Sequence, residues 1–456
     1  MNEQEAIAYV ESRAILGMRF GLVRMRELLR RLGDPQRRQP VVHIVGTNGK
    51  TSTTRLAAGA LMSQGFVVGA YVSPHVVSWN ERIEIDGTAV DGPRFASAVR
   101  RVRDAAIDLD GEEVTQFEVL TAAAFVVFAD AEVDVAVIEA GLGGRYDATN
   151  VLPRARVRSP GGRLSARPVV ALTNVSRDHT ELLGEDEVSI TAEKLAVCPD
   201  GFDRLLVGSL SPEATSAVDL ETARRGLVGA FSGRDFFVDR RDDGLHVRTP
   251  LASYGPLTLQ IEGQFQHDNL ALALACAERL LDRPLDPAGL ADALAAVRVP
   301  GRMERFAGQP EVLLDGAHNP AGIAALVGSL ETTPGQAIVA VVSVLDDKDL
   351  PAMIRPLAAK VSVVIATRSP HPRAVRPELI AAEVKGLGTS GHAVDDPAAA
   401  LEQARELAGP SGLVLVCGSL YLLGDLRHRL QAAKEAGASI PAIQAGPGLR
   451  SLTRRR

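Results

Sequence analysis

A glycine-rich segment near the start of the chain combines residue types that hold phosphate groups. The segment Gly46-Thr47-Asn48-Gly49-Lys50-Thr51-Ser52 lies between the apolar run 40–45 and a helical pattern over 53–63. Where a strand passes into a helix, backbone N–H groups attract phosphate, a lysine reaches its oxygens, and a hydroxyl can ligate Mg²⁺. The common spacing would place the first glycine where Ile44 stands, so this loop is a shortened variant. It predicts a nucleotide-phosphate site; the alternative is a glycine turn with a surface lysine.

A carboxylate follows a second apolar run. Glu139 comes directly after the run 133–138 and before a glycine turn, where its side chain can point at Mg²⁺. The alternative is a glutamate at a strand end with no ligand role. Other polar residues carry less information by themselves, because a lone histidine is more often structural than a ligand, and a lone lysine is more often on a helix surface.

The elements around these residues alternate between strands and helices. Residues 1–38 are predicted to be helical up to a stop at Gly33-Asp34-Pro35, and four arginines are expected to form a solvated helix face: Arg24, Arg26, Arg30 and Arg31. Apolar runs at 40–45, 67–72, 133–138 and 169–172 are predicted strands, and 53–63 and 117–128 are predicted helices. Two-sided apolar strands alternating with helices indicate a mostly parallel sheet that is covered on both faces.

A second unit begins near residue 300. The helix predicted over 290–296 ends there, and new strands are predicted at 312–314, 337–342, 361–366 and 413–417. The fold class is therefore α/β, with a phosphate-loop sheet domain over 1–299 and a smaller doubly wound domain of about 130 residues over 300–431. Residues 155–167 are predicted to be an exposed loop, and 432–456 a flexible tail that ends in three arginines.

Composition excludes several classes of protein. The chain has 456 residues, a net charge of −6, 46% apolar and 23% charged residues, which is ordinary for a globular protein and offers no basic field for nucleic acid or membrane. Three separated cysteines argue against a disulfide framework or a cysteine zinc site. No signal core and no apolar run of roughly 18 residues is present. We expect a cytoplasmic protein, and a monomer.

Taken in order, these and other segments carry a resemblance. Residues 45–52 resemble the nucleotide loop of the folylpolyglutamate synthase/dihydrofolate synthase family, a branch of the Mur ligase superfamily, and residues 137–150 resemble its other signature. Further matching segments are Phe20-Gly21-Leu22, Ser73-Pro74-His75, Asn80-Glu81-Arg82-Ile83, 117–121, Asp178-His179-Thr180, 192–194, 301–304, 315–320, 344–349 and 418–422. The resemblance covers nearly the whole chain apart from 155–167 and the tail.

The resemblance implies an ATP-dependent amide ligase. ATP would phosphorylate a carboxylate, and the amino group of L-glutamate would attack the acyl phosphate. The acceptors would be dihydropteroate, for the first glutamate, and reduced folates for later ones. ATP would be a co-substrate and Mg²⁺, two ions by resemblance, the cofactor. The first domain would bind ATP and the pterin or folate, and the second would bind glutamate.

The resemblance also implies roles for individual residues. Thr51, Ser73 and Glu139 match ligands of one magnesium ion, and Glu139 and His179 match ligands of a second. Lys194 matches a lysine that CO₂ carbamylates; the sequence alone favours an ordinary surface lysine. The catalytic set that follows is Lys50, His179, Lys194 and Arg302.

Binding residues follow in the same way. Asn269 matches an adenine contact, and Arg302 an arginine that reaches the phosphates, with a salt bridge as its alternative. Nucleotide and glutamate would be held by Asp315, His318, Ser419 and Tyr421, for which helix caps or core packing are the alternatives. Candidates for the pterin side are Arg82, Phe20, Gly21, Asn80, Gln116, Phe117 and Asp147.

Departures from the family pattern leave rival interpretations open. Thr51 replaces a common glycine, Phe265 a common histidine, and Arg177 an apolar residue. One rival is a synthase that performs a single step, or a paralogue that acts on a related acid. Another is a kinase or nucleotide switch, which would not need Arg302 or the cluster at 315–318. A third is a binding protein without catalysis, which intact Lys50 argues against.

Overall fold

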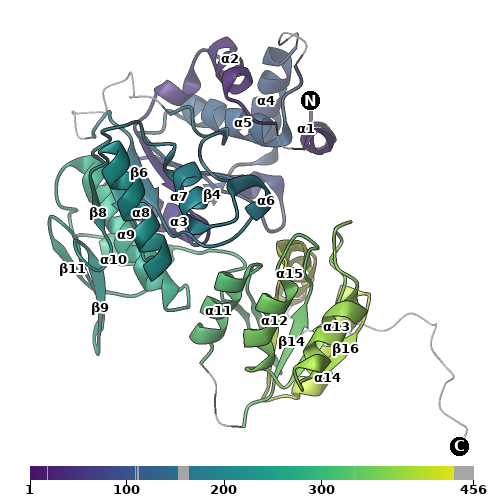
Figure 1. The fold of residues 1–456 in the computed structure, drawn as a ribbon. Coiled ribbons are helices and arrows are strands. Elements are labelled where there is room, and N and C mark those ends of the chain that lie inside the picture. The colour runs from purple at the N-terminus through teal and green to yellow at the C-terminus, as the bar shows by residue number, and fades with distance from the viewer. Residues whose placement is uncertain are drawn as a thin grey trace, which may run out of the picture. The chain divides into compact units, whose positions relative to one another are not determined.

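Each of the two units of the chain is built on its own mostly parallel sheet. The computed structural model describes residues 1–17, 19–107, 109, 112–152, 164–331, 333 and 335–435. Two compact units divide the chain, Met1–Pro300 and Gly301–Arg456, and Figure 1 shows their elements in order of colour. Because the parts are not placed relative to one another, each unit is described by itself.

The sheet of the first unit places the phosphate loop at its centre. Its strand order is β4-β3-β2-β5-β1-β6-β7-β8. The strands are β1 (Val41–Val45), β2 (Val68–Tyr71), β3 (Ile83–Ile85), β4 (Thr88–Ala89), β5 (Val135–Glu139), β6 (Val169–Leu172), β7 (Leu205–Val207) and β8 (Gly229–Phe231). All pairs from β2 to β8 are parallel, whereas β3 and β4 pair antiparallel. The loops that follow β1, β2, β5 and β6 therefore meet at one edge.

Helices cover both faces of this sheet. They are α1 (Glu3–Ser12), α2 (Val23–Arg31), α3 (Lys50–Met62), α4 (Gly92–Ala105), α5 (Gln116–Asp130), α6 (Thr180–Leu183), α7 (Glu187–Leu195), α8 (Pro212–Arg225), α9 (Phe265–Leu281) and α10 (Leu290–Ala296). Short 3-10 turns are η1 (Ala14–Leu16), η2 (Pro35–Arg37) and η3 (Trp79–Arg82). Helices α3 and α9 pack together on one face, and α4, α5, α7 and α8 belong to apolar clusters on the other.

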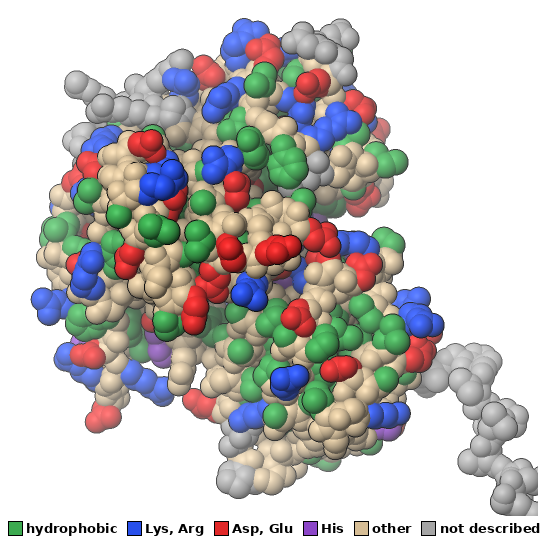
Figure 2. Space-filling view, viewed as in Figure 1, with side chains coloured by type: hydrophobic (Ala, Val, Ile, Leu, Met, Phe, Trp, Pro, Cys, Tyr) green, Lys and Arg blue, Asp and Glu red, His purple; other side chains and the backbone are tan. Residues whose placement is uncertain are grey.

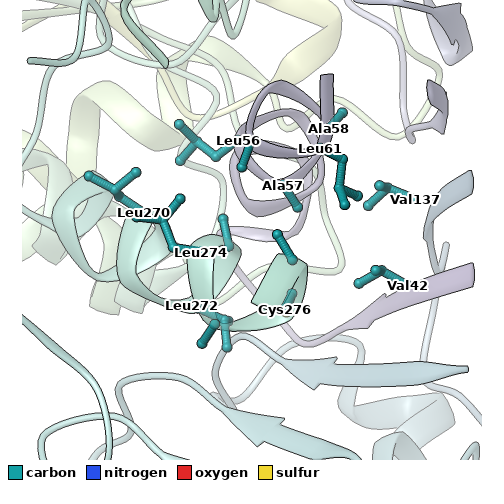
Figure 3. Close-up of a cluster of buried hydrophobic side chains, with 14 of the residues drawn as sticks. Val42, Leu56, Ala57, Ala58, Leu61, Val137, Leu270, Leu272, Leu274 and Cys276 are labelled. Carbon is teal, nitrogen blue, oxygen red and sulfur yellow. The ribbon is translucent and has the colours of Figure 1, made fainter. Parts of the chain in front are cut away.

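The side chains of β1 divide between three apolar clusters. Val42 and Ile44 join the cluster formed with α3 and α9, and Figure 3 shows Val42 facing the side chains of those two helices. Val41 belongs to the cluster beneath α4 and α5, and Val45 to the cluster beneath α7 and α8. Alternation along the strand thus anchors β1 on both faces, which holds the phosphate loop that follows it.

The second unit is a doubly wound sheet with strand order β12-β13-β17-β14-β15-β16. Its strands are β12 (Glu304–Phe306), β13 (Glu311–Leu314), β14 (Ile338–Val342), β15 (Val363–Ala366), β16 (Ser390–Ala393) and β17 (Leu413–Cys417), and its helices are α11 (Pro320–Ser329), α12 (Leu350–Ala358), α13 (Pro377–Gly386), α14 (Pro397–Ala408) and α15 (Leu420–Glu435). Helices α11, α12 and α13 pack in series, and α14 packs against α15. Since β17 returns between β13 and β14, its crossover helix α14 lies on the opposite face.

The α/β class with two successive sheets is confirmed, and several local expectations are corrected. The first 38 residues form α1, α2 and two short turns rather than one helical stretch. Leu164, expected in an exposed loop, is buried in the cluster of α3 and α9; residues 155–163 lie outside the described part. Residues 432–435, expected in the tail, continue α15, and 436–456 lie outside the described part.

A three-stranded antiparallel sheet was not expected from the sequence. It consists of β9 (Phe237–Arg241), β10 (Gly244–Arg248) and β11 (Ser253–Leu257). Its strands are five residues long, β9 ends in Asp239, Arg240 and Arg241, and β11 contains Gly255 and Pro256, so no continuous apolar run marks them. Val247 and Tyr254 nevertheless join the cluster of α3 and α9, and tertiary contact therefore stabilises strands that their own pattern does not predict.

Arg24 corrects the expectation of a solvated arginine face on α2. It is 7% exposed, and its Nε donates to both carboxylate oxygens of Glu118 at 3.0 and 2.9 Å. Its Nη1 donates to Glu112 at 2.9 Å. The partner Glu118 lies on α5, so only the packing of two distant helices buries this arginine, whereas Arg26 and Arg30 are exposed as expected.

Charges are mixed on the visible face of the molecule. Figure 2 shows lysine and arginine side chains interspersed with aspartate and glutamate over both sheets' helices on that face. Within the described residues, none of the helices has the length and apolar character that crossing a bilayer requires.

Candidate active site

The phosphate loop is held by the residues that follow β6. Thr173 Oγ1 donates to the carbonyl of Asn48 at 2.6 Å, Asn174 Oδ1 accepts the N–H of Asn48 at 2.9 Å, and the carbonyl of Asn174 accepts the N–H of Thr47 at 3.0 Å. Gly46 has φ +148°, and a Cβ there would collide with the hydroxyl of Thr173. The loop thus needs a glycine at this position, and Thr173 and Asn174 are partners that sequence reasoning missed.

Lys50 folds back over the loop. Its Nζ donates to the carbonyls of Gly46 at 3.2 Å and Thr47 at 2.8 Å. Helix α3 begins at Lys50, with Gly49 in a left-handed conformation at its N-cap. An ammonium group and a helix N-terminus at the same loop favour a bound phosphate.

Glu139 brings three of the predicted metal ligands together. The side chain is buried at the end of β5, and its carboxylate accepts the hydroxyl of Thr51 at 3.1 and 2.9 Å. The N–H of Ser73 donates to the same carboxylate at 3.2 Å. A carboxylate with two neighbouring hydroxyl-bearing residues is a set of hard oxygen donors, and these residues therefore fit Mg²⁺.

A metal at this position would rest on few protein ligands. Among the described residues, no group of three or more histidine, cysteine, aspartate or glutamate side chains gathers as a metal cluster. Magnesium commonly uses one or two carboxylates and completes its shell with water and substrate phosphates. The single carboxylate of Glu139 beside the phosphate loop matches that pattern.

His179 lies at the start of α6, after β6. It adopts a left-handed conformation with φ +51°, and its side chain is 38% exposed. Its Nε2 lies 3.8 Å from Asp178 Oδ1, which also accepts the N–H of His179 at 2.9 Å. The structure thus places His179 against Asp178, and its role as a metal ligand stays a prediction.

Lys194 is buried beneath the phosphate loop, and the alternative of a surface lysine is therefore wrong. It lies near the end of α7, is 3% exposed, and donates from Nζ to the carbonyl of Gly46 at 2.9 Å. Burial, with a smaller contribution from the charge of Lys50, lowers the pKa of Lys194 to about 7. A neutral amine is therefore accessible near neutral pH.

Asp147 holds the loop that follows β5. Its Oδ1 accepts the N–H of Thr149 at 2.9 Å and the hydroxyl of Thr149 at 2.5 Å, and its Oδ2 accepts the N–H of Leu142 at 2.8 Å. Burial raises the pKa of Asp147, against the effect of these hydrogen bonds. The carboxylate of Asp147, which was predicted to contact the pterin or folate, thus accepts its hydrogen bonds from residues of its own loop.

Arg82 forms a compact group with His75 and Trp79. Its Nε donates to His75 Nδ1 at 3.0 Å, and its guanidinium lies 4.9 Å from the centre of the Trp79 ring. The ring of His75 lies 4.3 Å from that of Trp79. Burial, together with the charge of Arg82, lowers the pKa of His75 to about 3. The predicted carboxylate-binding arginine is thus oriented by His75, which lies in a matching segment but was given no role of its own, and by Trp79, which the sequence analysis missed.

The predicted aromatic contacts lie in two places. The ring of Phe117, at the start of α5, lies with its centre 6.0 Å from that of Tyr71 in a tilted arrangement, and a Cβ on Gly141 would contact the Phe117 ring. Phe20 is 58% exposed and meets Tyr146, itself 48% exposed, edge to face at 5.7 Å. The sequence analysis gave Tyr146 no role of its own, although this residue lies within the second signature at 137–150.

Asn269 of α9 lies against the phosphate loop. Its Nδ2 donates to Gln266 Oε1 at 2.9 Å, and its Oδ1 accepts the hydroxyl of Thr53 at 3.4 Å. A Cβ on Gly49 would lie 2.5 Å from Asn269 Oδ1. The spacing of Gln266 and Asn269, one helical turn apart, was the available signal for the orienting role of Gln266.

In the second unit, Asp315 organises the loop after β13. Its Oδ2 accepts the N–H of Met303 at 2.9 Å and its Oδ1 accepts the N–H of Ala317 at 2.8 Å. Burial raises the pKa of Asp315, and the charge of Arg302 opposes that rise. His318 Nδ1 donates to the carbonyl of Gly316 at 2.7 Å. These predicted residues share one loop region at the carboxyl end of β13.

Ser419 and Tyr421 follow the neighbouring strand β17. Ser419 is buried, and its hydroxyl oxygen has no hydrogen-bond partner among the described residues. Tyr421 is 50% exposed, and its ring lies 4.3 Å from that of His371 in a tilted arrangement. His371, from the loop after β15, is a further polar residue at this edge that sequence reasoning missed.

Comparisons with known proteins agree on one family. The family described as Mur ligase, glutamate ligase domain, matches residues 301–420. The dihydrofolate synthase/folylpolyglutamate synthase of Mycobacterium tuberculosis is 33% identical over 89% of this chain and 89% of its own length. The folylpolyglutamate synthase of Lacticaseibacillus casei is 33% identical over 95% of this chain and 100% of its own length.

Solved structures match in the same way. The folylpolyglutamate synthase of M. tuberculosis complexed with ADP gives a TM-score of 0.83 at 30% identity, over 94% of this chain and 99% of that one. An Escherichia coli structure with DHPP and ADP gives 0.83 at 27% identity, over 95% and 99%. A Yersinia pestis bifunctional enzyme complexed with AMPPNP and Mn ion gives 0.81 at 27% identity, over 94% and 98%. The phosphate loop, the buried Glu139 beside it and this likeness along both units show that the chain belongs to the folylpolyglutamate synthase/dihydrofolate synthase family.

Proposed function

We propose that this ATP-dependent ligase joins L-glutamate to the carboxylate of dihydropteroate, of a (tetrahydro)folate, or of both, through an acyl-phosphate intermediate. One observation supports the proposal most strongly. The buried carboxylate of Glu139 accepts hydrogen bonds from the Thr51 hydroxyl and the Ser73 N–H, beside the loop that holds Lys50. A triphosphate, a carboxylate and an amino acid must meet in this reaction, and such a site offsets their repulsion.

The phosphate-loop residues would hold and orient the triphosphate. The N–H groups of the loop and Lys50 would contact the β- and γ-phosphates, with the ammonium of Lys50 leaving the carbonyls that it contacts here. Glu139, Thr51 and Ser73 would hold one divalent cation, and His179 with Glu139 a second. Bound cations would neutralise charge on the transferred phosphoryl group; the Mn ion in the Y. pestis structure supports a divalent metal in this family.

Lys194 would act as a carbamate near the second cation. Addition of its neutral Nζ to CO₂ forms a carbamate and releases one proton, which converts a neutral amine into an anion. The burial of Lys194 and its pKa of about 7 support this proposal, because an amine must be neutral to attack CO₂.

Adenine, glutamate and the acceptor would be bound by separate groups of residues. Asn269 would contact adenine, and Arg302 and Asp315 would contact the nucleotide from the second unit. Glutamate would be held by His318, Ser419 and Tyr421. The acceptor would contact Arg82, Phe20, Phe117 and Asp147; the E. coli structure in complex with DHPP and ADP supports small-molecule ligands in the family.

A product assay tests the proposal. The protein is incubated with ATP, Mg²⁺, L-glutamate and either dihydropteroate or tetrahydrofolate, and ADP and product mass are measured. We expect ADP release that depends on both glutamate and acceptor, with a product heavier by one glutamyl residue. Activity with one acceptor would define a single-step synthase, and ADP release independent of glutamate would favour a kinase and overturn the proposal.

A further inference from the structure

His43 is a polar residue in the seam between two apolar clusters. It lies on the same face of β1 as Val41 and Val45, which belong to the clusters beneath α4 and α5 and beneath α7 and α8, respectively. The imidazole is 3% exposed, and its Nε2 lies 2.8 Å from Thr149 Oγ1. A polar group in such surroundings is costly unless it is hydrogen-bonded, so the partner Thr149 is central to its presence.

The direction of the hydrogen bonds follows from the single hydrogen of a hydroxyl group. Thr149 Oγ1 lies 2.5 Å from Asp147 Oδ1, and the carboxylate of Asp147 also accepts the N–H groups of Thr149 and Leu142. Three donors favour the carboxylate anion. The Thr149 hydroxyl therefore donates to Asp147 and accepts the Nε2–H of His43. We call this series from His43 through Thr149 to Asp147 the β1 relay.

The loop that the β1 relay holds also packs against the end of α7. A Cβ on Gly144 would lie 2.5 Å from the carbonyl oxygen of Lys194. The N–H of Arg145 donates to the carbonyl of Glu193 at 3.0 Å, and its Nε donates to the carboxylate of Glu193 at 2.7 Å. Lys194 in turn donates to the carbonyl of Gly46. The contacts form a closed path, because β1 leads directly into Gly46.

The same loop begins at the predicted metal ligand. Glu139 ends β5, and the chain from residue 140 to 149 returns over β1, with Ala140 and Ala148 in the two clusters that flank His43. The loop therefore has its two ends fixed by apolar packing, and Asp147, near its second end, accepts the N–H of Leu142 near its first. Among the side-chain hydrogen bonds described for Asp147, only the one to the Thr149 hydroxyl leads on to β1, the strand that precedes the phosphate loop.

We propose that His43 and Thr149 are positioning residues, which hold Glu139 and Lys194 in register with the phosphate loop through Asp147. This inference rests on the proposed function, since it assigns the relay to the metal and phosphate end of that site. Groups that orient metal-binding side chains from behind typically change metal affinity or activity by roughly 10- to 100-fold when they are removed.

The test compares how strongly a metal promotes nucleotide binding. Calorimetry with ADP, with and without Mn²⁺, gives the factor by which Mn²⁺ strengthens ADP binding, and this measurement needs no turnover. In Thr149→Val and His43→Leu we expect this factor to fall by roughly tenfold or more. Thr149→Ser keeps the hydroxyl and His43→Gln keeps an N–H at the corresponding position, so both should retain most of the factor.

Thr249→Val is the matched control. Thr249 is also buried and also donates its hydroxyl to a buried carboxylate, that of Glu278, at 2.7 Å, but it belongs to the region of β10 and β11. This variant should lose a comparable amount of stability in urea unfolding while Mn²⁺ promotes ADP binding as in the wild type. If Thr149→Val does not fold, the pair His43→Leu and His43→Gln makes the same comparison.

The outcomes separate this inference from the proposed function. Wild-type protein that binds ADP with Mn²⁺ but shows no glutamate-dependent ADP release contradicts the proposed function alone. An unchanged Mn²⁺ factor in Thr149→Val and His43→Leu, or an equal loss in Thr249→Val, overturns the positioning role whether or not the wild type is a ligase.

Discussion

Two ammonium groups share one carbonyl oxygen at the phosphate loop. Lys50 Nζ and Lys194 Nζ donate to Gly46 O at 3.2 and 2.9 Å. Burial lowers the pKa of Lys194, and the like charge of Lys50 lowers it further. At the residue scale, two lysine side chains therefore meet at the carbonyl of Gly46, and a bound phosphate would offset the repulsion between them.

Replacement of Lys50 tests this interpretation. In Lys50→Ala we expect glutamate-dependent ADP release to fall by about 100-fold or more, because one preorganised cation at the transferred phosphoryl group is lost. Stability in urea should change little, since the variant also removes a charge that repels Lys194. Near-normal turnover would contradict the assignment of the phosphate loop.

His43 predicts a specific dependence of stability on pH. Burial lowers the pKa of His43 from 6.5 to about 3. Between these values the unfolded chain binds a proton that the folded chain does not, so the free energy of unfolding falls as the pH drops from about 6.5 towards 3. From pH 8 to pH 5 this single group should cost about 2 kcal/mol.

His43→Gln removes that titration while keeping an N–H donor. Urea unfolding at pH 8 and pH 5 should therefore show a loss of stability on acidification that is smaller by about 2 kcal/mol than in the wild type. Equal losses in both proteins would mean that His43 becomes protonated in the folded state, which would be incompatible with its buried position in the β1 relay.

At the scale of elements, α5 is nearly all apolar and holds one buried charge. The side chain of Glu118 caps the start of α5 by accepting the N–H of Thr115 at 2.8 Å, and it pairs with Arg24 of α2. One carboxylate thus caps the start of α5 and also holds α2 against it. Removal of one partner of a buried ion pair leaves an uncompensated charge, which is more costly than the pair is stabilising.

Two arginines of the same helix make this testable. Arg24→Met should destabilise the protein by about 3 kcal/mol, because Glu118 is left without its partner. Arg26→Met, at an exposed position of the same helix, should change stability by less than about 0.5 kcal/mol. The measurement is urea unfolding of both variants, and equal effects would show that Arg24 is solvated after all.

At the scale of the whole molecule, the chain consists of two units with separate sheets. The first unit has its clusters around β1, and the buried side chains of β13, β14 and β17 lie within the second sheet. Each unit therefore buries its own apolar core, which is the requirement for independent folding.

Fragments 1–300 and 301–435 test this division. Each should unfold cooperatively in urea when followed by circular dichroism, because each contains a complete sheet with helices on both faces. Neither alone should show glutamate-dependent ADP release, since the proposed glutamate residues lie in the second fragment and the phosphate loop in the first. A fragment without a cooperative transition would show that its core depends on the other unit.

Much of the architecture could be predicted from local sequence. The strands at 169–172 and 413–417 and the helix at 290–296 have the expected bounds, because continuous apolar runs between turns carry their own signal. The phosphate loop was predictable for the same reason, since its glycines, lysine and hydroxyls are adjacent in the chain. Thr51, Ser73 and Glu139 were expected together, and the structure brings them together.

Tertiary structure decided what depends on a partner far away in the chain. Arg24 has the sequence context of a surface residue and is buried by Glu118; Lys194 has the context of a helix surface and lies beneath Gly46. The strands β9 to β11 form without a continuous apolar run, and His43 takes the role proposed for it through its contact with Thr149. Local patterns determined the elements and the phosphate loop, whereas charges and polar side chains took their roles from packing, because burial and hydrogen-bond partners are set by residues that no local window contains.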